Sequence, residues 1–136
     1  MKEVIMTTNA PKAVGPYSQA VSLNGTLYVS GQLPINPQNG LMADGIEAQT
    51  RQSLDNLGAI LNAADLDYSD VVKTTVLLAD IKDFAAMNAV YADYFPQPSP
   101  SRVCFQVAAL PMGALVEIDA IAGYSADFPE TDLAGE

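Results

Sequence analysis

The fold is decided by residues 71–107, which read VVKTTVLLADIKDFAAMNAVYADYFPQPSPSRVCFQV. Residues 71–78 are mostly β-branched or apolar, which predicts a buried strand. A helix follows from Asp83, because aromatic and apolar side chains recur at spacings of three and four until Pro96 ends the pattern. Residues 101–107 alternate in character, which predicts a second strand. The two faces of that strand carry Val103, Phe105 and Val107 on one side and Arg102, Cys104 and Gln106 on the other.

The segments outside this stretch are predicted from the same periodicities and from turn residues. A hairpin is expected from strands at 20–23 and 26–30, because Asn24-Gly25 between them favours a type I′ turn. A helix is expected at 46–62, where apolar residues form one stripe and Asp44 is placed to cap the start. A loop is predicted at residues 31–45 and a final strand at residues 115–122.

The predicted order of elements is therefore ββαβαββ. Runs of strands with two helices between them are typical of an α+β layer fold, a sheet backed by two helices on one face. The uncovered face of such a sheet must meet either water or another subunit.

Size and composition indicate one domain that associates with other copies. The chain has 136 residues, enough for one core, and we place the domain at residues 1–126, followed by an acidic tail at 127–136. Hydrophobic residues make up 49% and charged residues 16% of the chain, whereas charged residues are roughly 25% of an average globular protein. The surplus of apolar surface favours a subunit interface.

The charge and the missing residue types exclude several classes of function. A net charge of −10 opposes binding to nucleic acid or to an anionic membrane. The chain has no histidine, which excludes a Ser-His-Asp triad and the usual zinc clusters. A single cysteine, no apolar run of membrane-spanning length and no apolar core in the first nine residues lead us to expect a cytoplasmic protein.

Arg102 is the first candidate for a functional side chain. It lies among small and apolar residues, where a guanidinium, which does not deprotonate, needs a partner. Its planar fork matches a carboxylate, so one hypothesis is that Arg102 binds a substrate carboxylate. The alternative is a structural ion pair with one of the 16 acidic residues, which is the common fate of such an arginine.

Glu117 is the second candidate. Strand alternation places Glu117 and Asp119 on one face of residues 115–122, opposite Val116 and Ile118. A partly buried carboxylate there is able to orient a water molecule or to move protons. The alternative is the solvated face of an edge strand.

Three other positions allow both a functional and a structural interpretation. Cys104 shares a face with Arg102, but without a histidine to act as its base it is more often a small apolar filler than a nucleophile. Tyr17 lies in a loop after Gly15-Pro16 and either walls a pocket or covers the core. Ser30-Gly31 either lets a ligand approach the backbone closely or forms a turn.

Five motifs occur in order between Ala10 and Tyr124. They are Gly15-Pro16-Tyr17-Ser18-Gln19-Ala20, Tyr28-Val29-Ser30-Gly31-Gln32-Leu33-Pro34, Met87-Asn88 with Tyr91 and Tyr94-Phe95, Pro100 to Pro111 with Arg102, and Glu117-Ile118-Asp119-Ala120-Ile121-Ala122. Together they resemble the RidA (YjgF) family. Ser101 departs from that family's pattern, in which alanine is typical before the arginine.

The resemblance implies a chorismate-mutase-like fold that assembles as a homotrimer, with a barrel-like centre and three clefts between subunits. It also implies an activity, the hydrolysis of 2-aminoacrylate and 2-aminobutenoate to 2-keto acids and ammonia without a cofactor. These enamine acids are released from serine and threonine by pyridoxal-phosphate dehydratases.

The same resemblance implies roles for single residues. Arg102 is expected to bind the substrate carboxylate and Glu117 to act with a catalytic water. Tyr17 is expected to line the cleft from a neighbouring subunit. Backbone groups at Gly31 and Cys104, together with Ser30, complete the expected ligand contacts.

Other functions share these residues. A non-catalytic protein that binds or senses a 2-keto acid or an amino acid would use Arg102 in the same way. A ribonuclease or translation inhibitor, an activity ascribed to some relatives, is disfavoured by the acidic charge and the lack of histidine. A chaperone would need an exposed apolar surface.

Overall fold

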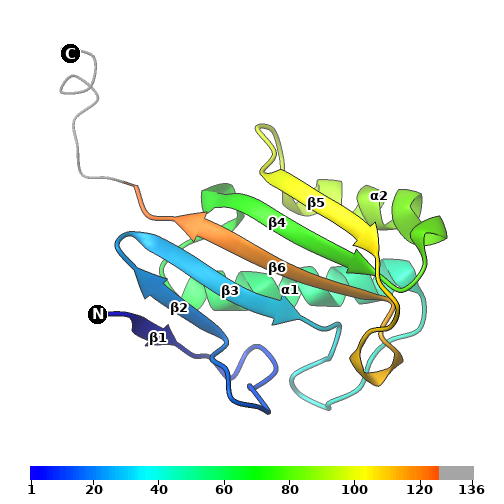
Figure 1. The fold of residues 1–136 in the computed structure, drawn as a ribbon, viewed down its shortest axis with the longest axis horizontal. Coiled ribbons are helices and arrows are strands. Elements are labelled where there is room, and N and C mark those ends of the chain that lie inside the picture. Colours follow the sequence, from blue (N-terminus) through cyan, green and yellow to red (C-terminus); the bar gives the residue numbers. More distant parts are fainter. Residues whose placement is uncertain (126–136) are drawn as a thin grey trace.

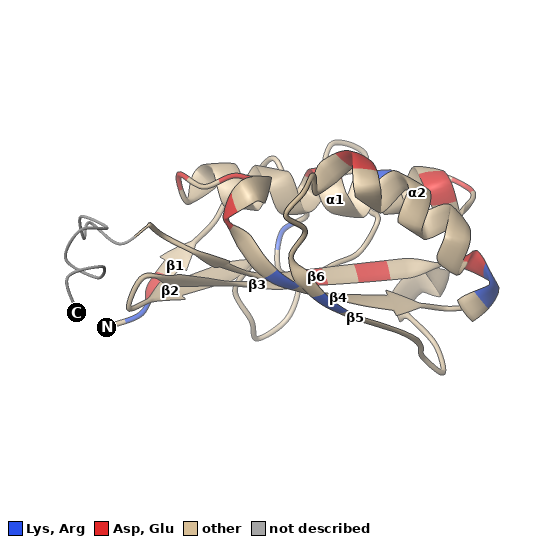
Figure 2. Cartoon of the chain, turned by 90° about the horizontal axis from the view of Figure 1, so that it is seen from above, with Lys and Arg blue, Asp and Glu red and all other residues tan. Residues whose placement is uncertain are grey.

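Six strands form one sheet, and two α-helices cover one of its faces, in the computed structural model, which describes residues 1–125 (Figures 1 and 2). The strands are β1 (Glu3–Ile5), β2 (Ala20–Leu23), β3 (Thr26–Gln32), β4 (Val71–Leu78), β5 (Ser101–Gln106) and β6 (Val116–Gly123). The helices are α1 (Ile46–Ala63) and α2 (Phe84–Tyr94). The predicted α+β class, with one sheet and two helices, is confirmed, and the tail predicted at residues 127–136 lies outside the described residues.

The strand order across the sheet is β1-β2-β3-β6-β4-β5. Neighbouring strands are antiparallel except for β4 and β5, which are parallel because helix α2 carries the chain back across the sheet between them. Strand β6 therefore lies inside the sheet, between β3 and β4, and β5 forms one edge (Figure 1).

The predicted hairpin is present with the predicted turn. Asn24 and Gly25 have φ values of 53° and 78°, the positive angles that a type I′ turn requires at both central positions. Leu23 pairs with Thr26 directly across the turn.

Several boundary predictions were wrong. The predicted order of elements lacks β1, a strand too short to leave a periodic pattern, which pairs with β2. Gly31 belongs to β3 rather than to the following loop. Asp44 does not cap α1, because Gly45 occupies the N-cap position with a φ of 90° and no side-chain hydrogen bond is made there.

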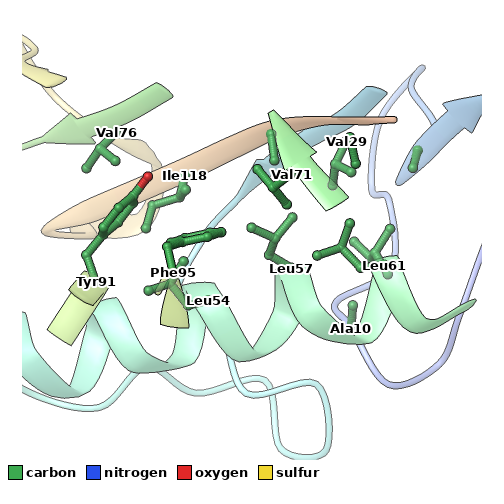
Figure 3. Close-up of a cluster of buried hydrophobic side chains, with 14 of the residues drawn as sticks. Ala10, Val29, Leu54, Leu57, Leu61, Val71, Val76, Tyr91, Phe95 and Ile118 are labelled. Carbon is green, nitrogen blue, oxygen red and sulfur yellow. The ribbon is translucent and has the colours of Figure 1, made fainter. Parts of the chain in front are cut away.

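The core lies between the helices and the covered face of the sheet. Leu57 and Leu61 of α1 point toward Val71 of β4 and Val29 of β3, and Tyr91 of α2 points toward Val76 of β4 (Figure 3). Leu54 and Leu57 are completely buried, and burial of such a side chain contributes about 1.5–3 kcal/mol to folding. This packing fixes α2 over β4 and β5.

Polar residues of α1 hold the long loop between β3 and α1. The side-chain amide of Asn56 donates to the carbonyl oxygens of Leu33 and Ile35, at 3.1 and 2.9 Å. Gln49 donates to the carbonyl of Ala43 and accepts from the backbone N–H of Leu115. The loop is thus attached to the helix that follows it, which its sequence did not indicate.

No helix in the described part of the chain covers the opposite face of the sheet (Figure 2). Strand pairing places Tyr28 of β3 and both Val103 and Phe105 of β5 on this open face, where all three side chains are exposed, Phe105 by 45%. The open face therefore presents large exposed apolar side chains, which are suited to contact with other protein rather than with water. Within residues 1–125, neither helix has the length and apolar character needed to cross a membrane.

Candidate functional site

Arg102 lies on β5 and points to the helix-covered side of the sheet, beside Thr74 of the adjacent strand. Its Nη1 donates a hydrogen bond of 2.7 Å to Oδ1 of Asn88 on α2. The guanidinium carbon lies 4.9 Å from the ring centroid of Tyr91 and 5.5 Å from that of Phe84. All of these partners are neutral.

No carboxylate within residues 1–125 pairs with Arg102. The only ion pair in this part of the chain joins Arg51 to Asp93 at 3.4 Å, on the exposed surface of the helices. The structural ion pair considered for Arg102 is therefore absent within these residues. Because Asn88 occupies only one of the five N–H donors, the guanidinium retains donors for an anionic ligand.

A hollow of about 610 Å³ lies beside Arg102, where the end of α2 approaches the start of β5. Aromatic and small residues form its walls, and Arg102, Asn88, Gln97 and Ser99 supply polar groups. Such a mixture is typical of a site for a small molecule with one charged group.

Cys104 lies two residues after Arg102 on the same face, as predicted, and packs against the core beside Val76. Burial raises the pKa of its thiol, although the nearby Arg102 acts in the opposite direction. A raised pKa disfavours the thiolate, so the structure supports the interpretation of Cys104 as a small apolar filler rather than a nucleophile.

Glu117 points to the open face from β6, as the strand alternation predicted for Glu117 and Asp119. The alternative of an edge strand was wrong, because β6 lies between β3 and β4 and Glu117 is only partly exposed. Burial raises the pKa of its carboxyl group, and the neighbouring Asp119 adds to the effect. Glu117 therefore binds a proton more readily than an ordinary glutamate, a property that suits proton transfer.

Gly31 lies directly beside the Glu117 carboxyl group. A methyl group added at Gly31 would lie 2.7 Å from Oε2 of Glu117, closer than such atoms approach. The register between β3 and β6 shifts between Val29 and Gln32, which is the local irregularity of a β-bulge. Glycine at this position leaves the carboxyl group in its present place, and a larger residue would displace it.

Tyr17 and Ser30 line a second hollow of about 620 Å³. The Tyr17 side chain is 51% exposed, so it does not cover the core and is free to wall a pocket. The hydroxyl of Ser30 donates to the carbonyl of Ser18 at 2.6 Å, and the backbone N–H of Ser30 donates to the carbonyl of Gln19. Ser30 thus attaches the loop that carries Tyr17 to strand β3.

Gln19 holds the same loop from its other side. This structural role of Gln19 was not predicted from the sequence. Its side chain is nearly completely buried. It accepts from the backbone N–H of Thr7 and donates toward the carbonyl oxygens of Thr7, Ala10 and Pro11. A glutamine within a motif carries no signal of such contacts, because its partners lie 8 to 12 residues earlier in the chain.

The candidate residues therefore fall into two groups. Arg102 and Cys104 face the helices, whereas Glu117 and Gly31 lie on the open side of the sheet. One chain consequently does not bring Arg102 and Glu117 into a single site. Within residues 1–125, no three His, Cys, Asp or Glu side chains gather into a potential metal site.

Comparison with known proteins identifies the family. A family model described as Endoribonuclease L-PSP matches residues 7–124. The chain belongs to this family, the RidA family.

Two relatives and one solved structure illustrate the similarity. The mouse protein named 2-iminobutanoate/2-iminopropanoate deaminase is 52% identical over 123 residues, which cover 90% of this chain and 91% of the mouse protein. Reactive Intermediate Deaminase A from Arabidopsis thaliana is 52% identical over 122 residues; these cover 89% of this chain but 65% of the longer plant protein. The crystal structure of E. coli TdcF with bound serine has a TM-score of 0.88 and 43% identity, and covers 90% of this chain and 99% of TdcF.

Proposed function

We propose that this RidA-family chain hydrolyses 2-imino acids and their enamine forms, 2-aminoacrylate and 2-aminobutenoate, to 2-keto acids and ammonia. The observation that carries the proposal is Arg102, a cation with neutral partners, beside a hollow of small-molecule size. The names of the mouse and Arabidopsis relatives support the reaction, and serine bound to TdcF supports a ligand that carries a carboxylate.

The active protein in this proposal is a homotrimer with its sites between subunits. Arg102 and Glu117 point away from opposite faces of the sheet, so one site contains both only if two copies contribute. The exposed apolar side chains of the open face supply the surface for that association. Tyr17, on its well-held loop, then closes the site from the neighbouring copy.

The chemistry follows from the positions of two charged groups. Arg102 forms two parallel hydrogen bonds with the substrate carboxylate and fixes the adjacent C2 atom. Glu117 accepts a proton from a water molecule as the water oxygen bonds to C2 of the imine, giving a carbinolamine. That proton passes to the imine nitrogen as the C=N π bond opens, which completes the carbinolamine. Glu117 then moves the proton of the new hydroxyl group to the nitrogen, the C–N bond breaks as the C2 carbonyl forms, and the 2-keto acid and ammonia leave.

The remaining residues of the proposed site hold these two groups in place or contact the ligand through the backbone. Gly31 leaves room for the Glu117 carboxyl group, and Ser30 holds the loop of Tyr17. Backbone groups at Gly31 and Cys104 are the proposed ligand contacts. The reaction as written balances with water alone and needs no cofactor.

A protein that binds amino acids or 2-keto acids without turnover is the second candidate, favoured by the bound serine of TdcF. Arg102 serves both functions, whereas Glu117 in its partly buried setting is needed only for catalysis. Measurement of turnover therefore separates the two.

The test couples the purified protein to serine or threonine dehydratase and follows 2-keto acid release. We expect the wild type to accelerate release and Arg102→Ala to lose the acceleration. Arg51→Ala is the matched control, since Arg51 forms only a surface ion pair, and it should behave as wild type. Binding of serine or 2-oxobutanoate by folded wild type without acceleration on either substrate would replace the deaminase proposal with the sensor.

A further inference from the structure

Three side chains of α2 hold the guanidinium group of Arg102. Phe84, Asn88 and Tyr91 are spaced by four and three residues, so they share one face of the helix. Each contacts the guanidinium group, Asn88 by its hydrogen bond and the two aromatic residues by their rings. Tyr91 has the nearer ring, at 4.9 Å.

Tyr91 is in turn held by strand β4. Its side chain is 7% exposed, and its hydroxyl lies 2.7 Å from Oγ1 of Thr74, which is completely buried. Thr74 pairs directly with Arg102 across the parallel strands β4 and β5. The hydroxyl bond therefore joins the Tyr91 ring to the strand position immediately beside the arginine.

We propose that Tyr91, fixed by Thr74, is a positioning residue that sets the plane of the Arg102 guanidinium for a ligand carboxylate. This inference rests on the proposed role of Arg102 as the carboxylate receptor. An arginine side chain has several rotatable bonds, and a group that restricts it before binding reduces the entropy lost on binding. An aromatic face does so without neutralising the charge, unlike a carboxylate partner.

The protonation of Tyr91 is consistent with this role. Burial raises the pKa of its hydroxyl, so the ring stays neutral at physiological pH. A neutral ring stabilises the cation by its face alone, and the full charge of Arg102 remains available to the ligand.

The competing explanation is that Tyr91 only fills the core. Its ring also packs on Phe95, with centroids 4.6 Å apart, and a filler of this kind affects stability but not ligand affinity. Ligand affinity and stability therefore have to be measured on the same variants.

The experiment measures calorimetric binding of 2-oxobutanoate, an unreactive 2-keto acid, together with thermal unfolding. The variants are Tyr91→Leu, Tyr91→Phe, Thr74→Val and Arg102→Ala. Tyr94→Leu and Tyr94→Phe are the matched controls, because Tyr94 is on the same helix but its hydroxyl bonds Asp55 rather than Thr74.

We expect Tyr91→Leu to weaken binding roughly two- to thirty-fold, the range of a lost cation–π contact. Tyr91→Phe keeps the ring and should retain most of the affinity, while Thr74→Val should fall between the two. Both Tyr94 variants should bind as wild type even where they lower the melting temperature.

Wild-type affinity in folded Tyr91→Leu would overturn the inference, as would an equal loss in Tyr94→Leu. If Arg102→Ala also binds as wild type, the proposed function itself fails. If Arg102→Ala loses binding and Tyr91→Leu does not, only the positioning role is refuted.

Discussion

Arg102 and Glu117 illustrate how far single residues were predictable from the sequence. Alternation along two strands placed Arg102 with Cys104 and Glu117 with Asp119, and the strand registers agree. The alternation did not reveal that these pairs lie on opposite faces of one sheet, because that depends on the strand order. Asn88, whose amide holds Arg102, was noted only as part of a motif, since its partner lies 14 residues away on another element.

The contacts of Arg102 predict that catalysis needs the planar shape of its guanidinium group as well as the positive charge. Arg102→Lys preserves the positive charge but loses the planar fork and the stacking on Tyr91. We expect kcat/KM to fall about ten- to a hundred-fold, as expected for the loss of one charged hydrogen bond. Arg51→Lys is the control in the dehydratase-coupled assay, and near wild-type turnover by Arg102→Lys would contradict a bidentate contact.

Replacement of Glu117 by glutamine is expected to abolish activity and to raise stability at neutral pH. Its pKa is raised in the folded protein, so the native state binds more protons than the unfolded state between the unfolded pKa, about 4.3, and the raised value. The free energy of unfolding therefore falls as pH rises through that window, and the whole of this loss is present above it. Glu117→Gln should unfold at a higher temperature than wild type at neutral pH, with the difference shrinking as pH falls toward 4, and should be inactive. A lower melting temperature at neutral pH would argue against this account.

At the scale of elements, the sequence predicted what periodicity and turn chemistry determine. The Asn24-Gly25 turn and strand β4 were placed correctly, because positive φ and β-branched side chains leave a local signal. Strand β1 was missed because three residues carry no period. The cap of α1 was assigned to Asp44, but the backbone enters the helix through Gly45 in a conformation that favours glycine.

The bulge in β3 is the element on which the position of Glu117 depends. Gly31→Ala places a methyl group 2.7 Å from the present position of Oε2, so the carboxyl group must move. We expect kcat to fall roughly ten- to a hundred-fold, the effect of a displacement of about 1 Å in a catalytic group. Affinity for 2-oxobutanoate should fall less than kcat, because Arg102 is untouched and alanine keeps the backbone groups that we propose contact the ligand.

Gly123→Ala, on the neighbouring strand β6, is the matched control for this bulge. An added methyl group there meets nothing within 4 Å, so activity should remain at the wild-type level. Equal activity in Gly31→Ala and Gly123→Ala would show that the contact between Gly31 and Glu117 does not serve catalysis.

At the scale of the whole molecule, composition predicted surplus apolar surface but not its place. Strand register now locates it on the open face, where Phe105 and Tyr28 are exposed. An aspartate in place of Phe105 would put a charge into the proposed subunit contact, where it lacks a partner. We expect Phe105→Asp to be monomeric and inactive by sedimentation and coupled assay, whereas Phe105→Leu should stay trimeric. A folded, fully active Phe105→Asp monomer would refute the shared site.

The most direct test of the account asks whether Arg102 and Glu117 act from different copies. Arg102→Ala and Glu117→Gln chains are each inactive as pure trimers, and they are mixed by unfolding and refolding together in equal amounts. If each site takes Arg102 from one copy and Glu117 from the next, about one site in four is intact after random mixing, and the mixture regains about a quarter of wild-type activity. Mixed trimers without any regained activity would contradict the central claim that two copies complete the site.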